Sequence, residues 1–221
     1  MYTAHLKRMD TKKNIILLIL VGILIVTAAL GCKREPTEPS TKPEPKPHSI
    51  HEAAKVGSKT AVEEFLLKGN KVNMKDKFGM TPLHYAAAYG QKEVAELLLA
   101  NGADVDARNE RGGTPLGQAV MGVGRNKEVT ELLVRKGADV NTRNLDGRTP
   151  LHKAAMSAEP DLVEMLLING ANPEARDNDG KTPLDRAISL SETQFRRGST
   201  MAKRKKELEA CVQILRKHTR R

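Results

Sequence analysis

Residues 81–90, TPLHYAAAYG, recur in varied form along the chain and decide its fold. Further segments that begin with TPL start at Thr114, Thr149 and Thr182, so the four are spaced by 33, 35 and 33 residues. An incomplete segment, HSIHEAAKVG, begins at His48, 33 residues before the first full one. Five units in phase at this period are typical of a solenoid, in which each unit buries its apolar face only against its neighbours.

Each unit carries the local signals of two helices and a turn. Thr is a good helix N-cap, and Pro at the first helical position has no N–H to leave unpaired. A second apolar stretch follows at helical spacing, as at Val94 and Leu98, and Gly102 lies just past it, where a left-handed C-cap is favoured. Turns between units are expected over residues 76–79, 109–112, 144–147 and 177–180.

The pattern T-P-L-H-x-A-A at this period resembles the ankyrin repeat. The resemblance covers residues 48–221. It implies an all-α solenoid of about five helix–turn–helix repeats with β-turn fingers, and a protein partner of unknown identity; a monomer is expected. The units are placed at about residues 48–80, 81–113, 114–148, 149–181 and 182–221.

Several units depart from the ankyrin pattern. Unit one has His48 and Ser49 in place of Thr-Pro, which is typical of an N-terminal cap. Unit three has two extra residues, expected between its helices, and Gly117 where His is usual. Unit five has Asp185 at that position, and its additional residues 191–206 are expected to form a loop and an extended final helix.

The chemistry-bearing residues favour a structural interpretation. His51, His84 and His152 follow the repeat period, so they lie in separate units and cannot converge on a metal; the resemblance implies hydrogen bonds near the Thr of TPL. Cys211 is expected to be a small buried apolar residue of the last helix. No catalytic motif is present, and neither enzymatic activity nor a cofactor is expected.

The net charge of +10 does not belong to the repeats. Residues 48–190 carry a net charge of −1, whereas residues 1–47 carry +4 and residues 191–221 carry +7. No basic stripe runs along the solenoid, so nucleic acid is not an expected partner. The basic C-terminal tail has two interpretations: it binds an anionic membrane surface, or it is a charged cap that keeps the end of the solenoid soluble.

The N-terminal segment has the pattern of an export signal. Residues 15–31 contain no charge and follow a basic stretch, and "Ala29-Leu30-Gly31-Cys32" resembles a bacterial lipobox. The resemblance implies cleavage after Gly31 and lipid attachment to Cys32; the alternative is an uncleaved anchor helix. Translation could also begin at Met9. Residues 1–31 are therefore interpreted as signal peptide and residues 32–47, rich in Pro, Glu and Lys, as a tether in the bacterial cell envelope, facing the periplasm or the exterior.

The resemblance also places the binding surface. In ankyrin stacks the fingers and first helices line a concave groove that holds a protein partner. The family's variable positions correspond here to Lys77, Phe78, Met80, Ala88, Tyr89, Glu110, Arg111, Met121, Leu145, Arg148, Met156, Asn178 and Lys181. Exposed aromatic residues beside Arg are the composition of interface hot spots, so a groove centred on units two to four is expected. The alternative function is that of a purely structural spacer in the envelope.

Overall fold

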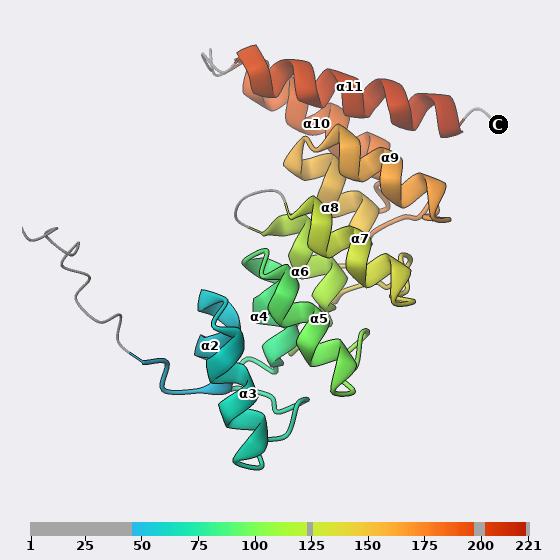
Figure 1. The fold of residues 1–221 in the computed structure, drawn as a ribbon. Coiled ribbons are helices and arrows are strands. Elements are labelled where there is room, and N and C mark those ends of the chain that lie inside the picture. The colour runs from blue at the N-terminus through green and yellow to red at the C-terminus, as the bar shows by residue number, and fades with distance from the viewer. Residues whose placement is uncertain (1–45, 123–125, 197–201, 220–221) are drawn as a thin grey trace, which may run out of the picture. The chain divides into compact units, whose positions relative to one another are not determined.

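The computed structural model describes residues 46–122, 126–196 and 202–219, which belong to one compact unit, Lys46–Arg221 (Figure 1). Cys32, the predicted signal peptide and nearly all of the predicted tether lie outside the described residues. Within the described ranges the chain forms helices and no strand. The helices are α2 (Ile50–Val56), α3 (Lys59–Leu67), α4 (Pro82–Ala88), α5 (Lys92–Ala100), α6 (Pro115–Met121), α7 (Lys127–Arg135), α8 (Pro150–Ser157), α9 (Pro160–Ile168), α10 (Pro183–Arg196) and α11 (Ala202–Thr219).

The helices form two layers, as the sequence predicts. The first helices of the units, α2, α4, α6, α8 and α10, pack on one another in chain order, and each also packs on the second helix of its own unit (Figure 1). Small residues permit this close approach: Ala86, Ala87, Ala119 and Ala154 have no exposed surface. The fold is therefore the expected all-α solenoid.

The helix ends follow the sequence signals. The Thr149 side chain accepts a hydrogen bond from the His152 N–H, and Pro150 is the first helical residue. Gly102 has a φ of +83° just after α5, and the N–H of the next residue, Ala103, bonds back to the Leu98 carbonyl. This arrangement satisfies carbonyl groups that the end of a helix leaves unpaired.

The extra residues of unit three lie between its helices, as expected, because α6 ends at Met121 and α7 begins at Lys127. Asn126, just before α7, donates hydrogen bonds from Nδ2 to the carbonyls of Ala87 and Ala88 in the previous unit, at 2.9 and 3.1 Å. The residue just before α7 is therefore held against the previous unit.

The final unit contains more helix than the sequence indicated. Residues 191–206 were expected to start with a loop, but α10 continues through residue 196 and α11 starts at residue 202. The physical reason is that no Gly or Pro follows Pro183 until Gly198, so nothing stops the helix earlier. Helix α11 does form the expected extended final helix, and it buries Leu208, Cys211 and Leu215.

Cys211 of α11 is an apolar core residue, as the sequence predicts. Burial raises the pKa of its thiol to about 12.

In the part of the chain that the structure describes, no helix is both long and apolar enough to cross a bilayer.

Candidate functional site: the concave groove

The four fingers are built by one side chain each. Asp76 starts the first finger, and its Oδ1 accepts hydrogen bonds from the N–H groups of Phe78 and Met80 at 2.8 and 2.9 Å. Gly79 completes the turn with a φ of +70°, a conformation that residues with a Cβ rarely adopt. Asn109, Asn144 and Asp177 build the other three fingers in the same way. The turns predicted from the sequence are confirmed.

Backbone hydrogen bonds join each finger to the next. The Glu110 N–H donates to the Phe78 carbonyl at 3.1 Å, and the Leu145 N–H donates to the Arg111 carbonyl at 3.0 Å. Asn178 continues the series by donating to the Asp146 carbonyl at 3.0 Å. The finger tips thus form one connected edge, which fixes the order in which their side chains face the groove.

None of the thirteen predicted groove residues is buried. Phe78, Tyr89, Met121 and Leu145 are 55%, 40%, 60% and 70% exposed, and large apolar side chains with such exposure are available for contact. Met80 is half-buried, and its sulfur accepts a hydrogen bond from Asn109 Nδ2 at 3.1 Å. The other exposed members are Lys77, Glu110, Arg111, Asn178 and Lys181, and the other half-buried ones are Ala88, Arg148 and Met156.

The groove has a hollow at its N-terminal end, of about 690 Å³, between α2 and the first finger. His51, Phe78 and Tyr85 line it, and Tyr85 Oη donates to Asp76 Oδ2 at 2.7 Å. Burial and this hydrogen bond raise the pKa of Tyr85 to about 12, so the phenol stays neutral. The Lys77 ammonium lies 5.0 Å from the centre of the Phe78 ring, a cation–π distance. This hollow brings together two predicted groove residues, Lys77 and Phe78.

Below the groove, His84 and His152 each join the first helix of a unit to the backbone at the end of the same unit. The Thr81 N–H donates to His84 Nδ1 at 3.1 Å, so the ring proton is on Nε2, which bonds the Gly113 carbonyl at the end of unit two at 3.0 Å. His152 makes the same two bonds, to Thr149 and to the Lys181 carbonyl. Burial lowers the pKa of both imidazoles and keeps them neutral. The structural interpretation of these two residues is confirmed.

Units one and five bond the backbone at this position in other ways. Unit one has no TPL Thr, so the expected bond near Thr does not exist for His51, and its Nε2 instead bonds the Met74 carbonyl at 2.9 Å. In unit five the Asp185 carboxylate takes the place of the imidazole and accepts bonds from Thr182 N and Oγ1, both at 2.9 Å. The backbone bond from Thr182, more than any other contact, lowers the pKa of Asp185.

Unit three is different, because Gly117 provides no side chain at this position. Lys153 of the next unit fills the space: it is only 8% exposed, and its Nζ donates to the Gly117 carbonyl at 3.3 Å. Burial lowers the pKa of Lys153, and the charge of Asp146 offsets only part of that effect. A cation from unit four thus lies where units two and four have a neutral imidazole.

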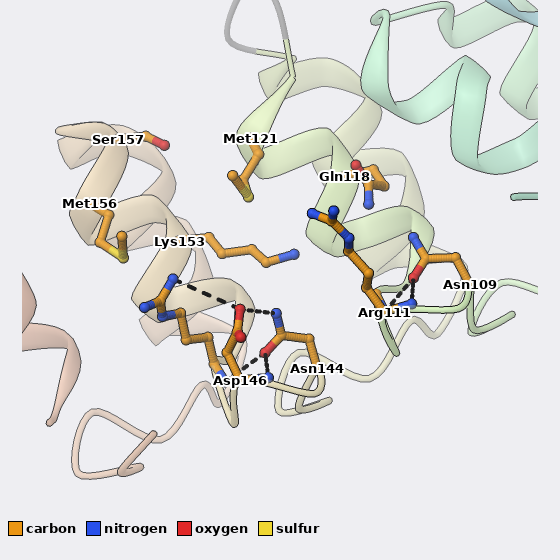
Figure 2. A pocket seen from close by; sticks show the side chains of 11 residues that line it. Asn109, Arg111, Gln118, Met121, Asn144, Asp146, Lys153, Met156 and Ser157 are labelled. Atoms are coloured by element: carbon orange, nitrogen blue, oxygen red, sulfur yellow. Dashed lines mark hydrogen bonds and ion pairs between the residues drawn. The ribbon is translucent and has the colours of Figure 1, made fainter. Parts of the chain in front are cut away.

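The Lys153 ammonium faces a second hollow of about 450 Å³, which we call the Lys153 hollow. Figure 2 shows Lys153 extending from α8 across it toward the side of Arg111 and Gln118. Four of the predicted groove residues line it: Arg111, Met121, Arg148 and Met156. The other seven predicted residues, outside both hollows, are Met80, Ala88, Tyr89, Glu110, Leu145, Asn178 and Lys181.

Sequence reasoning missed two features of this face. The role of Lys153 was not predicted. The sequence signal for it was Gly at residue 117, where the repeat usually has His. Basic residues that recur at the repeat period are exposed and also bond to the next unit: Lys75 Nζ donates to the Arg108 carbonyl at 2.9 Å, and Arg108 Nη1 donates to the Arg143 carbonyl at 3.0 Å. The recurrence of one basic residue per unit was the sequence signal for these contacts between units.

Comparison with known proteins agrees with this geometry. A family model described as ankyrin repeats (3 copies) matches residues 50–144 and 119–196. This chain belongs to the ankyrin repeat family. No curated protein matches it closely enough to count as a relative. The ankyrin repeat domain is a module typical of protein–protein interaction, and the partner's identity is not shown by the family.

No group of three or more potential metal-ligating side chains converges within the described residues. The three His residues of the period lie in separate units, where each bonds a backbone carbonyl.

Proposed function

We propose that this ankyrin repeat protein is a non-catalytic interaction module, tethered to a bacterial membrane, that binds a protein through the concave groove of units two to four. The observation that carries the proposal is the set of exposed apolar side chains, Phe78, Tyr89, Met121 and Leu145, on the fingers and at the ends of α4 and α6. Aromatic and Met side chains are enriched in interfaces, whereas solvent contact of such residues has no benefit for stability.

The groove is tested by the variants Phe78→Ala, Tyr89→Ala and Leu145→Ala in residues 46–221. This fragment contains the whole compact unit. Each variant is expected to keep its thermal midpoint within a few degrees and to lose proteins captured from an envelope extract. Leu67→Ala and Ile168→Ala are matched controls, because these apolar residues are 88% and 76% exposed at the ends of the outer helices α3 and α9. A triple variant that captures the same proteins as the wild type would disprove the groove as the binding surface.

The membrane tether rests on the sequence alone. Residues 15–31 lack charge, Cys32 follows a lipobox-like segment, and the Pro-rich residues 33–47 separate it from the first repeat. Acyl chains contribute about 0.8 kcal/mol per buried methylene, so two or three chains would hold the protein firmly. The test is expression of the full gene in a bacterium with labelled palmitate, with and without Cys32→Ser. Label is expected in the membrane-bound wild type only, and label retained by the variant would refute lipidation of Cys32.

A second candidate is a membrane-surface binding site on α11. Residues 203–206 are four consecutive exposed basic residues in the first turns of this helix, where the helix dipole disfavours positive charge. Their placement therefore has a small cost in stability. We expect anionic liposomes to bind residues 46–221 and to lose this binding when Lys203, Arg204 and Lys206 are changed to Gln. The control is Arg216→Gln with Lys217→Gln at the other end of α11; absence of binding in the wild type would exclude the site.

A further inference from the structure

The Lys153 hollow contains an ammonium whose hydrogen-bond donors are not all satisfied by the described residues. Lys153 is nine-tenths buried, and among the described residues the hydrogen bond of its Nζ is the single 3.3 Å contact with the Gly117 carbonyl. An ammonium has three donors, and a donor–acceptor distance of 3.3 Å is long for N–H···O. A buried charge with so few partners costs folding free energy, so stability does not explain its presence.

The space for this ammonium exists because residue 117 is Gly. A Cβ added at Gly117 would lie 2.9 Å from Lys153 Nζ, whereas units two and four have a full imidazole at the same position. The ammonium consequently occupies space that a side chain at residue 117 would fill. Its position depends on two units at once, Gly117 of unit three and Lys153 of unit four.

The charges of the hollow leave an excess of positive charge. Arg111, Arg148 and Lys153 line it together with one carboxylate, Asp146, and Arg148 Nε also lies 3.7 Å from Oδ2 of the buried Asp177. Asp146 already has partners, because its Oδ2 accepts from Asn144 Nδ2 at 3.2 Å and lies 3.9 Å from Arg148 Nη1. One further carboxylate would therefore supply the acceptor that Lys153 lacks.

The walls of the hollow suit a side chain of a polypeptide. Its volume of about 450 Å³ falls within the range of small-ligand pockets, about 300–1,000 Å³. Met121, which is 60% exposed, and Met156 form its apolar side, and Met side chains adapt to varied partners. The hollow also belongs to the groove that the proposed function assigns to a protein.

We propose that the Lys153 hollow is a subsite that binds an Asp or Glu side chain of the partner, within a segment that also places an apolar residue against Met121 and Met156. The inference rests on the proposed function, since it names the chemistry that this part of the groove recognises. The carboxylate bonds Lys153 Nζ, with Arg111 at the side. A doubly charged phosphate fits less well, because two carboxylates, Asp146 and Asp177, already lie beside Arg148.

The test begins with a library of random twelve-residue peptides displayed on phage, selected on residues 46–221. We expect enrichment of an acidic residue next to an apolar one. A selected peptide should bind the Lys153→Met variant at least tenfold more weakly than the wild type, and Glu→Gln or Asp→Asn in the peptide should have no further effect in that variant. Such coupling in a double-mutant cycle is the signature of direct contact.

Two variants separate loss of the site from loss of fold. Gly117→Ala keeps every charge but displaces the ammonium, so it should also weaken binding; the thermal midpoints of both variants should match the wild type or exceed it. Lys136→Met is the matched control, because Lys136 is exposed at the end of α7, away from the groove, and should leave the affinity unchanged.

The outcomes distinguish this inference from the proposed function. Peptides that lack an acidic residue, or that bind Lys153→Met as tightly as the wild type, would overturn the subsite; if Phe78→Ala and Leu145→Ala still weakened them, the groove would remain a binding surface. A phosphoserine peptide that binds more tightly than its Glu counterpart would also overturn it. No enriched peptide at all would count against both.

Discussion

Units two and four use the fourth position of the TPL segment differently from unit three. In the first two, a neutral imidazole bonds the TPL Thr at one side and the carbonyl of the unit's last residue at the other. In unit three, Gly117 leaves this space to the ammonium of Lys153, which comes from the following unit. The fourth position of the TPL segment therefore holds a stabilising imidazole in units two and four. In unit three the missing side chain leaves space for Lys153 beside the groove.

The largest effect is expected from breaking the imidazole contacts. His84→Ala and His152→Ala each leave a Thr N–H and the carbonyl at the end of the unit without their buried partner. We expect each variant to lose about 2–4 kcal/mol of unfolding free energy, measured by urea denaturation of residues 46–221. A loss below about 1 kcal/mol in both would show that these contacts do not stabilise the solenoid.

A pH titration tests the same contacts without mutation. Burial lowers the pKa of His84 and His152, so the unfolded chain takes up protons first as the pH falls. Stability should be complete above pH 6.5 and should decline as the pH falls below this value, toward the folded pKa. Asp185 has a lowered pKa, so its contribution should persist until the pH falls to about 4. A double His→Gln variant whose stability declines as steeply between pH 7 and 5 as that of the wild type would contradict this assignment.

A smaller effect, of opposite sign, is expected at the buried lysine. Because burial lowers the pKa of Lys153, its charged form costs free energy at neutral pH, and Lys153→Met removes this cost. We expect the unfolding free energy to rise by about 1 kcal/mol, while the exposed control Lys136→Met stays within about 0.5 kcal/mol of the wild type. A destabilised Lys153→Met would mean that the ammonium is a structural contact like the imidazoles.

The smallest change in stability is expected for Gly117→Ala. Ala favours a helix over Gly by about 0.5–1 kcal/mol, and the atom that the new Cβ meets is the mobile end of Lys153. We expect the thermal midpoint to stay equal or to rise by a few degrees, by differential scanning calorimetry. A clear fall would show that residue 117 must be Gly for packing, and that the ammonium cannot move aside.

The groove could be predicted only in part. None of the thirteen predicted residues is buried, because finger and first-helix positions follow from the repeat phase. Lys153 could not be found in this way, because its surroundings depend on the residue 36 positions earlier in the neighbouring unit. The repeat phase predicts the face of the solenoid on which a residue lies. It does not predict the space that side chains of the neighbouring unit leave unfilled.

The C-terminal unit shows the same limit in its backbone. Residues 191–196 were expected in a loop because they exceed the repeat length, yet the absence of Gly and Pro allows α10 to continue. For α11, packing decides: Leu208, Cys211 and Leu215 are buried, although four consecutive basic residues stand near its start. Local propensity and tertiary burial together set these bounds, and the repeat period does not.

The sequence by itself determined the all-α solenoid, its five units, the caps and the finger turns. These features depend on residues within one unit, such as Thr149 with Pro150, or Asp76 with Gly79, whose contacts are local in the chain. The tertiary structure decided where the two hollows lie and that Lys153 is buried beside Gly117. The reason is that each hollow is formed by side chains from different units, and their distances arise only when the units stack.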